Sequence, residues 1–358
     1  MSSHPALSTM EAALGRLLPL PSGELEFWGA DAAATLPHAP SRCEQGFRLG
    51  SDAIVARGWA VESGVEGVGA VLAPAPLPTV ILVLLPRSRE VGRGLLARGV
   101  ARLEAGGGLL LAAAHNDEGA RSFEKDLALL VPLSGSLSKH HGRAFWVRMA
   151  PGAGAFDKAL AEAWLAADAP RRDAPRRDAT TGLWQRPGVF NEGRLDGGSA
   201  LLIEHLPKDL RGRVADLGAG SGLLSLAVLE RCPAVTALEL FEAEARAVDL
   251  ARRNLAGARV PVGIHWHDVS AGVLSDGRAR FDAVVCNPPF HVGSRSVPAL
   301  GRAFIAAAAR ALAKDGQLLL VANRHLPYED ALREVFGRGE LLAEDGGFKV
   351  YRAWEPKP

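Results

Sequence analysis

The chain has 358 residues and a mass of 37.7 kDa, with 48% hydrophobic and 23% charged residues. This length is sufficient for two domains, and the composition argues against a disordered or fibrous chain. The 41 lysines and arginines nearly balance the 40 acidic residues, which gives a net charge of +1. This balance argues against a nucleic-acid binder that depends on bulk positive charge, although it leaves room for a local basic groove.

The three cysteines, Cys43, Cys232 and Cys286, are far apart and form no C-x-x-C pair. This spacing indicates neither a disulfide framework nor a metal site, and it favours a reducing cytoplasm. The first residues lack the features of a secretory signal, and no apolar run approaches the roughly 18 to 20 residues that cross a bilayer. We therefore expect a cytoplasmic monomer with no metal and no membrane association.

Residues 1–168 are expected to form a first, Rossmann-like domain. The predicted elements alternate between strand and helix: Thr79–Leu85, Glu90–Leu103, Gly108–Ala113 and Gly119–Leu130. The sequence LLPRSRE follows the first of these strands, where a cofactor loop would need closely spaced glycines. We predict a domain without a cofactor site, in which Gly106–Gly108 makes a helix-to-strand turn.

Residues 169–184 contain a tandem repeat, Ala-Pro-Arg-Arg-Asp at 169–173 and again at 174–178. The repeat offers no large apolar side chain, and its prolines disfavour a continuous helix. We interpret this segment as an interdomain linker. Its four arginines could contact phosphate, but a solvated spacer is the favoured interpretation.

Residues 185–358 are expected to form a complete, mostly parallel sheet. The predicted strands and helices are Arg213–Leu217, Leu223–Arg231, Val235–Leu240, Ala243–Leu255, Ile264–His267, Phe281–Cys286, Ser296–Ala313, Gln317–Ala322, Leu341–Glu344 and Phe348–Trp354. Gly346 and Gly347 separate the last two strands, which predicts a terminal antiparallel hairpin. The fold class is therefore α/β.

A glycine-rich loop follows the first strand of this second domain. Gly218, Gly220 and Gly222 would let the backbone turn tightly and approach a ligand. Asp216, just before them, would repel a pyrophosphate but attract the cationic amino-acid end of S-adenosylmethionine, so we predict that cofactor rather than NAD. A capping or turn role for Asp216 is the alternative.

A second acid at the end of the next strand is expected to accept the ribose hydroxyls of the cofactor. Glu242 and Glu239 are both candidates, with a slight preference for Glu242 because of its spacing to the following helix. The acid that is not used is expected to be a solvated residue at a helix start. Asp268 is placed to accept from an adenine amino group, and a plain turn role is its alternative.

The motif Asn287-Pro288-Pro289-Phe290 directly follows an apolar strand. The prolines stiffen the backbone at the carboxyl edge of the sheet, where open α/β folds bind ligands. Asn287 and Pro288 can offer two carbonyl acceptors to an exocyclic amine, which would orient its lone pair towards a methyl donor without a strong base. Phe290 offers an aromatic face to a planar base.

Together, the glycine loop and the Asn-Pro-Pro-Phe motif resemble class I S-adenosylmethionine-dependent N-methyltransferases that act on amino groups. Five segments further resemble the ribosomal small subunit methyltransferase C group: Arg186–Phe190, Leu195–Ser199, Asn287–His291, Val321–Tyr328 and Phe348–Ala353. The resemblance covers about Gln185 to Ala353. It implies two tandem methyltransferase-like domains, the first degenerate and the second catalytic, and formation of N2-methylguanosine in 16S rRNA.

The resemblance also suggests substrate contacts, with one departure from the family pattern. Phe190 is expected near the cofactor or target pocket, with a core position as its alternative. His291 and Arg295 are candidate contacts of the target or of phosphate. Val292 stands where the family commonly has Asp, which puts a polar role there in doubt.

The leading hypothesis is therefore a ribosomal RNA methyltransferase that takes a guanine out of its stack and methylates N2. The partner would be ribosomal RNA or the small ribosomal subunit. One alternative is a protein-glutamine N5-methyltransferase, because Asn-Pro-Pro with an aromatic residue serves any planar amino group. The other is a non-catalytic RNA-binding factor of ribosome assembly, which would require a vestigial cofactor loop.

Overall fold

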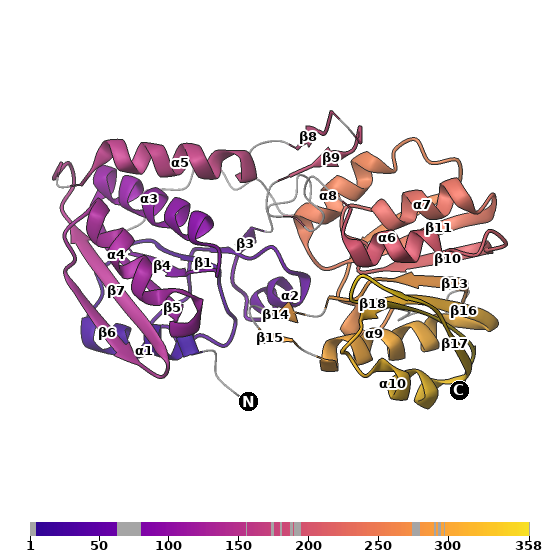
Figure 1. Cartoon of the computed structure of the whole chain (residues 1–358). Coiled ribbons are helices and arrows are strands. Elements are labelled where there is room, and N and C mark those ends of the chain that lie inside the picture. Colours follow the sequence, from indigo (N-terminus) through magenta and orange to yellow (C-terminus); the bar gives the residue numbers. More distant parts are fainter. Residues whose placement is uncertain are drawn as a thin grey trace. The chain divides into compact units, whose positions relative to one another are not determined.

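The computed structural model describes residues 5–62, 80–154, 156–172, 175–179, 181–186, 189, 195–273, 280–289, 291–292, 295–296 and 298–357. The chain divides into two compact units, Met1–Ala174 and Pro175–Pro358, and the division falls within the predicted linker. Each unit contains one large sheet with helices on both of its faces (Figure 1).

The first unit contains a seven-stranded sheet in the order β3-β2-β1-β4-β5-β7-β6. Its strands are β1 (Leu25–Trp28), β2 (Arg42–Glu44), β3 (Val61–Glu62), β4 (Val80–Leu84), β5 (Gly108–His115), β6 (Gly135–Lys139) and β7 (Gly142–Met149). Its helices are α1 (Pro5–Leu17), α2 (Arg48–Ala56), α3 (Arg89–Gly106), η1 (Asn116–Glu118), α4 (Ala120–Leu130) and α5 (Lys158–Arg172). All neighbouring strands are parallel except β7, which runs antiparallel to β5 and β6.

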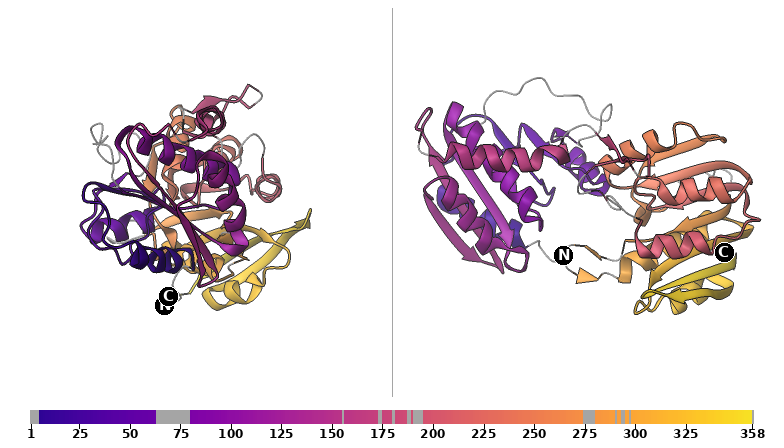
Figure 2. Two further views of the ribbon diagram at one scale, coloured as in Figure 1. Left: turned by 90° about the vertical axis from the view of Figure 1, so that its left-hand side faces the viewer. Right: turned by 45° about the horizontal axis from the view of Figure 1, so that its top comes forward.

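Alternate residues of the central strands supply the two cores of the first unit, because successive side chains point to opposite faces of a sheet. Ile81 and Val83 pack under α3, α4 and α5, whereas Val80 and Leu82 pack against α1 and α2. Figure 2 shows these helices on the two sides of the sheet. Burial on both faces explains why β4 reads as a continuous apolar run.

The second unit repeats this architecture in the order β12-β11-β10-β13-β16-β18-β17. The strands are β10 (Arg211–Leu217), β11 (Ala234–Glu242), β12 (Val262–Trp266), β13 (Phe281–Cys286), β16 (Leu312–Asn323), β17 (Phe336–Asp345) and β18 (Phe348–Pro356). Two short hairpins are made by β8 (Arg176–Arg177) with β9 (Trp184–Gln185) and by β14 (His291–Val292) with β15 (Arg295–Ser296). The helices are α6 (Gly197–Glu204), α7 (Leu223–Arg231), α8 (Ala245–Asn254), η2 (Val269–Ala271), α9 (Pro298–Ala311) and α10 (Tyr328–Val335).

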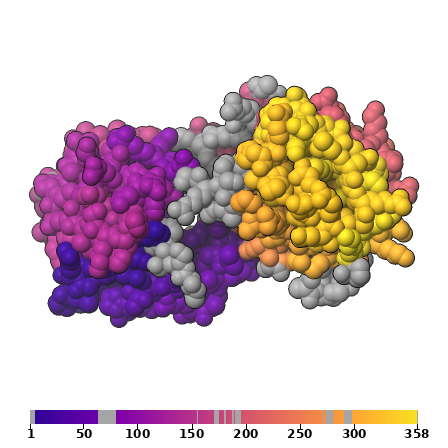
Figure 3. Space-filling model, turned by 60° about the horizontal axis from the view of Figure 1, so that its bottom comes forward, coloured from indigo at the N-terminus to yellow at the C-terminus, as the bar shows by residue number. Residues whose placement is uncertain are grey.

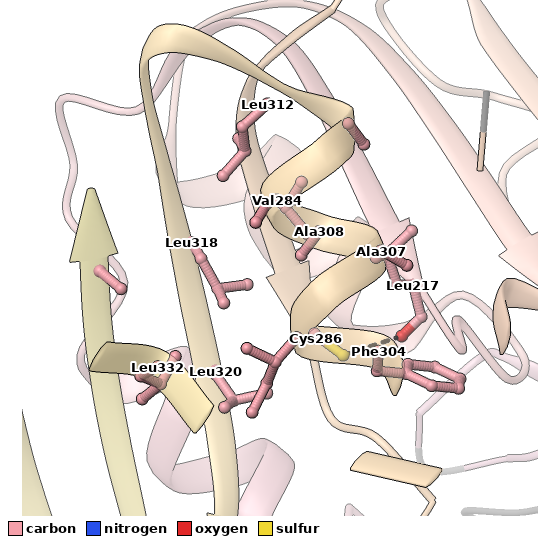
Figure 4. Close-up of a cluster of buried hydrophobic side chains, with 14 of the residues drawn as sticks. Leu217, Val284, Cys286, Phe304, Ala307, Ala308, Leu312, Leu318, Leu320 and Leu332 are labelled. Carbon is pink, nitrogen blue, oxygen red and sulfur yellow. Dashed lines mark hydrogen bonds between the residues drawn. The ribbon is translucent and has the colours of Figure 1, made fainter. Parts of the chain in front are cut away.

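The core of the second unit also has two sides. Helices α9 and α10 cover one face, where Phe304, Ala307 and Ala308 of α9 pack on Val284 and Leu318 of the sheet (Figure 4). Helices α6, α7 and α8 cover the other face. This sandwich holds the carboxyl ends of β10, β11 and β13 in fixed register, and the candidate site lies at those ends.

The terminal hairpin of β17 and β18 turns at Gly346 and Gly347, whose φ angles of 56° and 86° favour glycine. Strand β17 lies at the edge of the sheet and carries mostly exposed or partly exposed residues, including several charged ones. Charged edge strands resist pairing with other chains. In the space-filling view, the yellow carboxy-terminal residues form a broad part of the surface of the second unit (Figure 3).

The prediction of an α/β fold with two tandem methyltransferase-like sheets, the second ending in an antiparallel hairpin, is confirmed. When the strands of each large sheet are numbered by themselves in chain order, both sheets have the strand order 3-2-1-4-5-7-6. The first sheet is thus complete, although only part of it was predicted from residues 79–148.

The segment 169–184, predicted as an interdomain linker, contains the division between the units but also regular structure in two places. Helix α5 continues to Arg172, through the first proline of the repeat, and β8 pairs with β9 inside the supposed spacer. Packing explains the helix, since Ala161 and Trp164 of α5 are buried in the core beneath α3. Tertiary contacts of this kind override local propensity.

Candidate active site

The glycine loop connects β10 to α7. Gly218, Gly220 and Gly222 have φ angles of 73°, 55° and 84°, a region in which other residues are strained. The N–H groups of Gly218 and Ala219 donate to the Phe241 carbonyl at 2.8 and 3.2 Å, which ties the loop to β11. A Cβ at Gly218 would lie 3.1 Å from the Phe304 ring. The glycines are therefore required by the geometry of this loop.

Asp216 lies near the end of β10, directly beneath the loop, with only 1% of its surface exposed. The Ser225 hydroxyl donates to its Oδ2 at 2.7 Å. Burial raises the pKa of Asp216 to about 7, the Glu242 charge adds to the increase, and the Ser225 hydrogen bond opposes it. A cation bound beside Asp216 would stabilise its charged form and lower this pKa.

Glu242 is the acid that the structure brings to the glycine loop. Its Oε2 accepts from the Gly220 N–H at 2.8 Å, and its Oε1 accepts from the Glu244 N–H at 2.7 Å. Burial raises the pKa of Glu242, while these N–H groups lower it. Asp216 at the end of β10 and Glu242 at the end of β11 therefore form a pair of acids beside the glycine loop.

Glu239 lies elsewhere on β11. One oxygen of its carboxylate lies 2.7 Å from His265 Nε2, and the other lies 3.7 Å from the Arg213 guanidinium. Glu239 and Glu242 are three positions apart on β11, and side chains an odd number of positions apart point to opposite faces of a sheet. The expectation that the unused acid would be a solvated residue at a helix start is wrong for Glu239, which lies within β11. The residue that caps α8 is Glu244.

Asp268 follows β12 and caps the short helix η2. Its Oδ1 accepts from the Ser270 N–H at 2.9 Å, and its Oδ2 accepts from the Ser270 hydroxyl at 2.8 Å. Both oxygens are engaged locally, as the turn alternative expects. A contact of Asp268 with adenine stays a prediction.

Asn287 follows β13 at the same sheet edge as the glycine loop, because Leu217 and Cys286 are paired across the two strands. Its Nδ2 donates to Asp196 Oδ2 at 2.9 Å and to Ser199 Oγ at 2.8 Å. Pro288 is buried and Pro289 is exposed. The structure thus brings Asn287 and Pro288 next to the loop that carries Gly218.

The aromatic and substrate-facing predictions are less fully described. Phe290 and Phe190 lie outside the described residues. For His291 and Arg295 the structure describes the backbone, which pairs in the hairpin of β14 and β15, and not the side chains. Their proposed roles stay predictions.

The sequence analysis missed three polar residues that organise the site: Asp196, Ser199 and Ser225. Asp196 caps α6 by accepting from the Ser199 N–H at 2.8 Å. An Asp directly before a helix is a recognisable capping signal, so α6 could have been predicted. No local pattern could have revealed that Ser225 contacts Asp216 or that Ser199 contacts Asn287, because these are contacts of the folded chain.

Asn254, the last residue of α8, also supports the loop. Its Nδ2 donates to the Ser221 carbonyl at 2.9 Å and to the Trp184 carbonyl at 3.2 Å, and its Oδ1 accepts from the Trp184 N–H at 2.7 Å. One amide therefore joins the glycine loop to β9. The predicted linker residue Trp184 is part of the second unit's structure.

Within the described ranges, no group of three or more His, Cys, Asp or Glu side chains is arranged to hold a metal ion. None of the helices formed by those same residues has the length and apolar character to cross a membrane.

Comparison with known proteins supports this geometry. Residues 180–352 match the family model of the methyltransferase small domain. Two relatives named ribosomal RNA small subunit methyltransferase C, from Escherichia coli (strain SMS-3-5 / SECEC) and Escherichia fergusonii, are each 41% identical over 167 residues. That match covers 47% of this chain and 47% of each relative, so the chain spans about half the length of these relatives.

A solved structure covers more of the molecule. It is a T. thermophilus 16S rRNA N2 G1207 methyltransferase (RsmC) in complex with AdoMet and guanosine, similar over 99% of this chain and 92% of that one, with a TM-score of 0.73 and 22% identity. At this identity the likeness shows the fold. Residues 180–352 are therefore similar to the methyltransferase small domain, and the chain has the two-domain fold of that solved methyltransferase.

Proposed function

We propose that the second unit transfers a methyl group from S-adenosylmethionine to the exocyclic N2 amine of a guanosine in 16S ribosomal RNA. Two relatives are named ribosomal RNA small subunit methyltransferase C, and the similar solved structure is a 16S rRNA N2 methyltransferase in complex with AdoMet and guanosine. The observation that carries the proposal is the adjacency of Gly218 and Asn287 at the carboxyl ends of paired strands β10 and β13.

The residues of the glycine loop fit the proposed cofactor. Asp216 and Glu242 are two acids in a desolvated setting, and a cation would relieve the cost of their charge. Glu242 would hold the ribose hydroxyls and Asp216 the cationic amino-acid end, while the glycines let the backbone come close. Bound there, S-adenosylmethionine supplies an electrophilic methyl group.

The chain's own contribution to the reaction is orientation. Asn287 Oδ1 and the Pro288 carbonyl would accept the two N–H groups of an exocyclic amine, which directs the nitrogen lone pair away from the protein. Holding reactants in one geometry replaces the need for a strong base, since the methylated amine becomes acidic and loses a proton to water. Phe290, by prediction, stacks on the base.

The decisive experiment is a labelled-methyl transfer assay. The full chain would be incubated with methyl-labelled S-adenosylmethionine and either 16S rRNA, assembled small subunits or a peptide-release factor. We expect label in RNA, recovered as N2-methylguanosine after nuclease digestion and mass spectrometry. Label in protein alone would support a glutamine N5-methyltransferase, and calorimetry without cofactor binding would support a non-catalytic assembly factor.

The same proposal has consequences for partners and place of action. The partner is ribosomal RNA or the small subunit, and we propose that the protein acts in the cytoplasm as a monomer during ribosome biogenesis. The three cysteines, Cys43, Cys232 and Cys286, are free and buried, as a reducing compartment permits. Sedimentation of the purified chain with and without small subunits would test the monomer and the partner together.

A further inference from the structure

The segment Leu195–Ser199 contacts the reacting edge of the sheet without belonging to the glycine loop or to the Asn-Pro-Pro motif. We propose that Asp196 and Ser199 are positioning residues that set the polarity of the Asn287 side-chain amide, so that Oδ1 and not Nδ2 faces the target amine. This inference rests on the proposed function and adds to it the groups that make the site selective for an N–H donor.

The chemistry of the neighbours dictates which end of the amide faces them. Asp196 Oδ2 and Ser199 Oγ lie 2.9 and 2.8 Å from Asn287 Nδ2. An ionised carboxylate can only accept hydrogen bonds, so the NH₂ end of the amide must face Asp196. Both hydrogens of Nδ2 then have an acceptor, and the amide group has only its carbonyl oxygen to offer.

The opposite orientation would be doubly unfavourable. A rotated amide would place Oδ1 against the Asp196 carboxylate, which repels it, and would present NH₂ hydrogens to an amine that also donates. Among the described residues, Asn287 Oδ1 accepts no hydrogen bond, so it is available to a target. Asp196 and Ser199 therefore make the Asn287 side chain a hydrogen-bond acceptor, and not a donor, towards the target.

The positioning segment is itself held firmly. Asp196 caps α6 through the Ser199 N–H at 2.8 Å, and Ser199 is 3% exposed. A Cβ at Gly198 would lie 3.0 Å from the Phe348 ring, and one at Gly197 would lie 3.2 Å from it. The two glycines therefore let the Phe348 ring of β18 pack directly on the start of α6. This contact explains why glycines stand between Asp196 and Ser199.

The test uses three variants of the full chain. Ser199→Ala removes one acceptor and leaves the helix cap in place. Asp196→Ala removes the other acceptor together with the cap. Asp196→Asn is the conservative variant, because its amide oxygen can replace Oδ2 in both hydrogen bonds. Asp157→Ala is the matched control, since Asp157 caps α5 by accepting from the Leu160 N–H and lies in the first unit.

We expect kcat on small-subunit RNA to fall about 10-fold in Ser199→Ala and about 100-fold in Asp196→Ala, with the Kd for S-adenosylmethionine within about twofold, because the loss is one of orientation. Asp196→Asn should keep kcat within about threefold, and Asp157→Ala should leave it unchanged while lowering thermal stability. Unchanged kcat in both Ser199→Ala and Asp196→Ala would overturn the inference.

A second readout does not depend on catalysis. The side-chain NH₂ resonances of Asn287, assigned by their loss in Asn287→Ala, should exchange with solvent at least about 10-fold faster in Ser199→Ala than in the parent chain, because a hydrogen bond to Nδ2 is lost. Equal exchange rates would overturn the inference. If the parent chain methylates no RNA, the proposed function fails, and this exchange measurement still decides the orientation of the amide.

Discussion

The two units share one strand order, yet the loops at matching places differ in chemistry. Phe27-Trp28-Gly29-Ala30 at the end of β1 in the first unit corresponds to Asp216-Leu217-Gly218-Ala219 at the end of β10 in the second. Gly29 and Gly218 have φ angles of 67° and 73°. The N–H groups of Ala30 and Ala219 donate to the neighbouring strand at 3.1 and 3.2 Å. The backbone turn is therefore retained in both units.

The side chains at this turn are not retained. Phe27, fully buried, stands where Asp216 stands, and Gln45 stands where Glu242 stands. Gln45 Oε1 accepts from the Phe47 N–H at 3.1 Å, the same two-residue contact that Glu242 makes with Glu244 at 2.7 Å. The first unit therefore has the same backbone-to-side-chain hydrogen bond at this place, but a neutral amide instead of a carboxylate.

The two units also differ at the end of β4 and of its counterpart β13. Register pairs Trp28 with Val83 and Leu217 with Cys286, so Leu84 matches Asn287. At the first unit's edge, the Arg98 guanidinium lies 3.8 Å from the centre of the Trp28 ring. A sheet of this strand order thus forms in the first unit without the two acids and the amide, to which we assign a role in the proposed chemistry of the second unit.

The largest expected effect comes from restoring an acid to the first unit. Phe27→Asp removes a buried aromatic ring and buries a charge, so we expect a loss of at least about 4 kcal/mol in the free energy of unfolding. Phe27→Leu, which keeps the apolar character, should cost only about 1 kcal/mol. Urea denaturation followed by circular dichroism measures both. A Phe27→Asp chain as stable as the parent would show that this position tolerates the acid.

The next largest effect is expected on kcat, where Asn287 should differ from Leu84, the residue at the matching place in the first unit. Asn287→Ala removes one amine acceptor, so we expect kcat to fall about 100-fold while the Kd for S-adenosylmethionine changes less than about twofold. Leu84→Ala, at the matching place in the first unit, should leave kcat unchanged. Steady-state methyl transfer and calorimetry measure the two quantities. Equal kcat in Asn287→Ala and the parent would rule out the amine-orienting role.

The buried acid Asp216 gives the second unit a pH dependence of stability that its counterpart in the first unit, Phe27, cannot give. The pKa of Asp216, about 7 in the folded chain, exceeds its ordinary value of 3.8, so the folded state binds the proton more tightly. This contribution to stability is present in full below about pH 4 and is lost as the pH rises through about 7. Asp216→Asn should therefore match the parent at low pH and exceed it at pH 8 by on the order of 2 kcal/mol.

Thermal or urea unfolding at several pH values measures this difference. Asp315→Asn, at an exposed position, serves as the control and should follow the parent at every pH. An Asp216→Asn chain that is less stable than the parent at pH 8 would mean that the carboxylate is charged and well stabilised in the fold.

A smaller effect, on the affinity for S-adenosylmethionine, is expected when Glu242 and its counterpart Gln45 are each replaced by the other residue type. Glu242→Gln should weaken S-adenosylmethionine binding about 10-fold, because a neutral amide accepts a hydroxyl hydrogen bond less strongly than a carboxylate. Gln45→Glu should leave the affinity unchanged, since the first unit lacks the other acid. Calorimetric titration of each variant measures both values. A second binding event in Gln45→Glu would show that the first unit is one substitution away from a cofactor site.

The smallest expected effect is the release of less than one proton per chain when S-adenosylmethionine binds. A cation beside Asp216 favours its charged form and lowers its pKa, so cofactor binding near pH 6.5 should release protons. The observed binding enthalpy should then depend on the ionisation enthalpy of the buffer. Asp216→Asn should remove most of that dependence, and a dependence that survives the substitution would assign the proton to another group.

Much of the second unit could be predicted because its signals are contiguous in the sequence. The strand Phe281–Cys286 and the helix Leu223–Arg231 agree in both bounds with β13 and α7, since each is a periodic apolar run with a clear end. The first unit was harder to predict. Strands β1, β2 and β3 contain four, three and two residues, which is too short for a pattern.

The amino-acid sequence by itself determined the fold class, the glycine loop with Asp216, and the Asn-Pro-Pro motif, because each depends on neighbours along the chain. Only the tertiary structure decided that Glu242, and not Glu239, lies at the loop. It alone showed that Asn287 meets Asp196, 91 residues away. A sheet brings strand ends together across long separations, and the hydrogen bonds made there leave no trace in local sequence patterns.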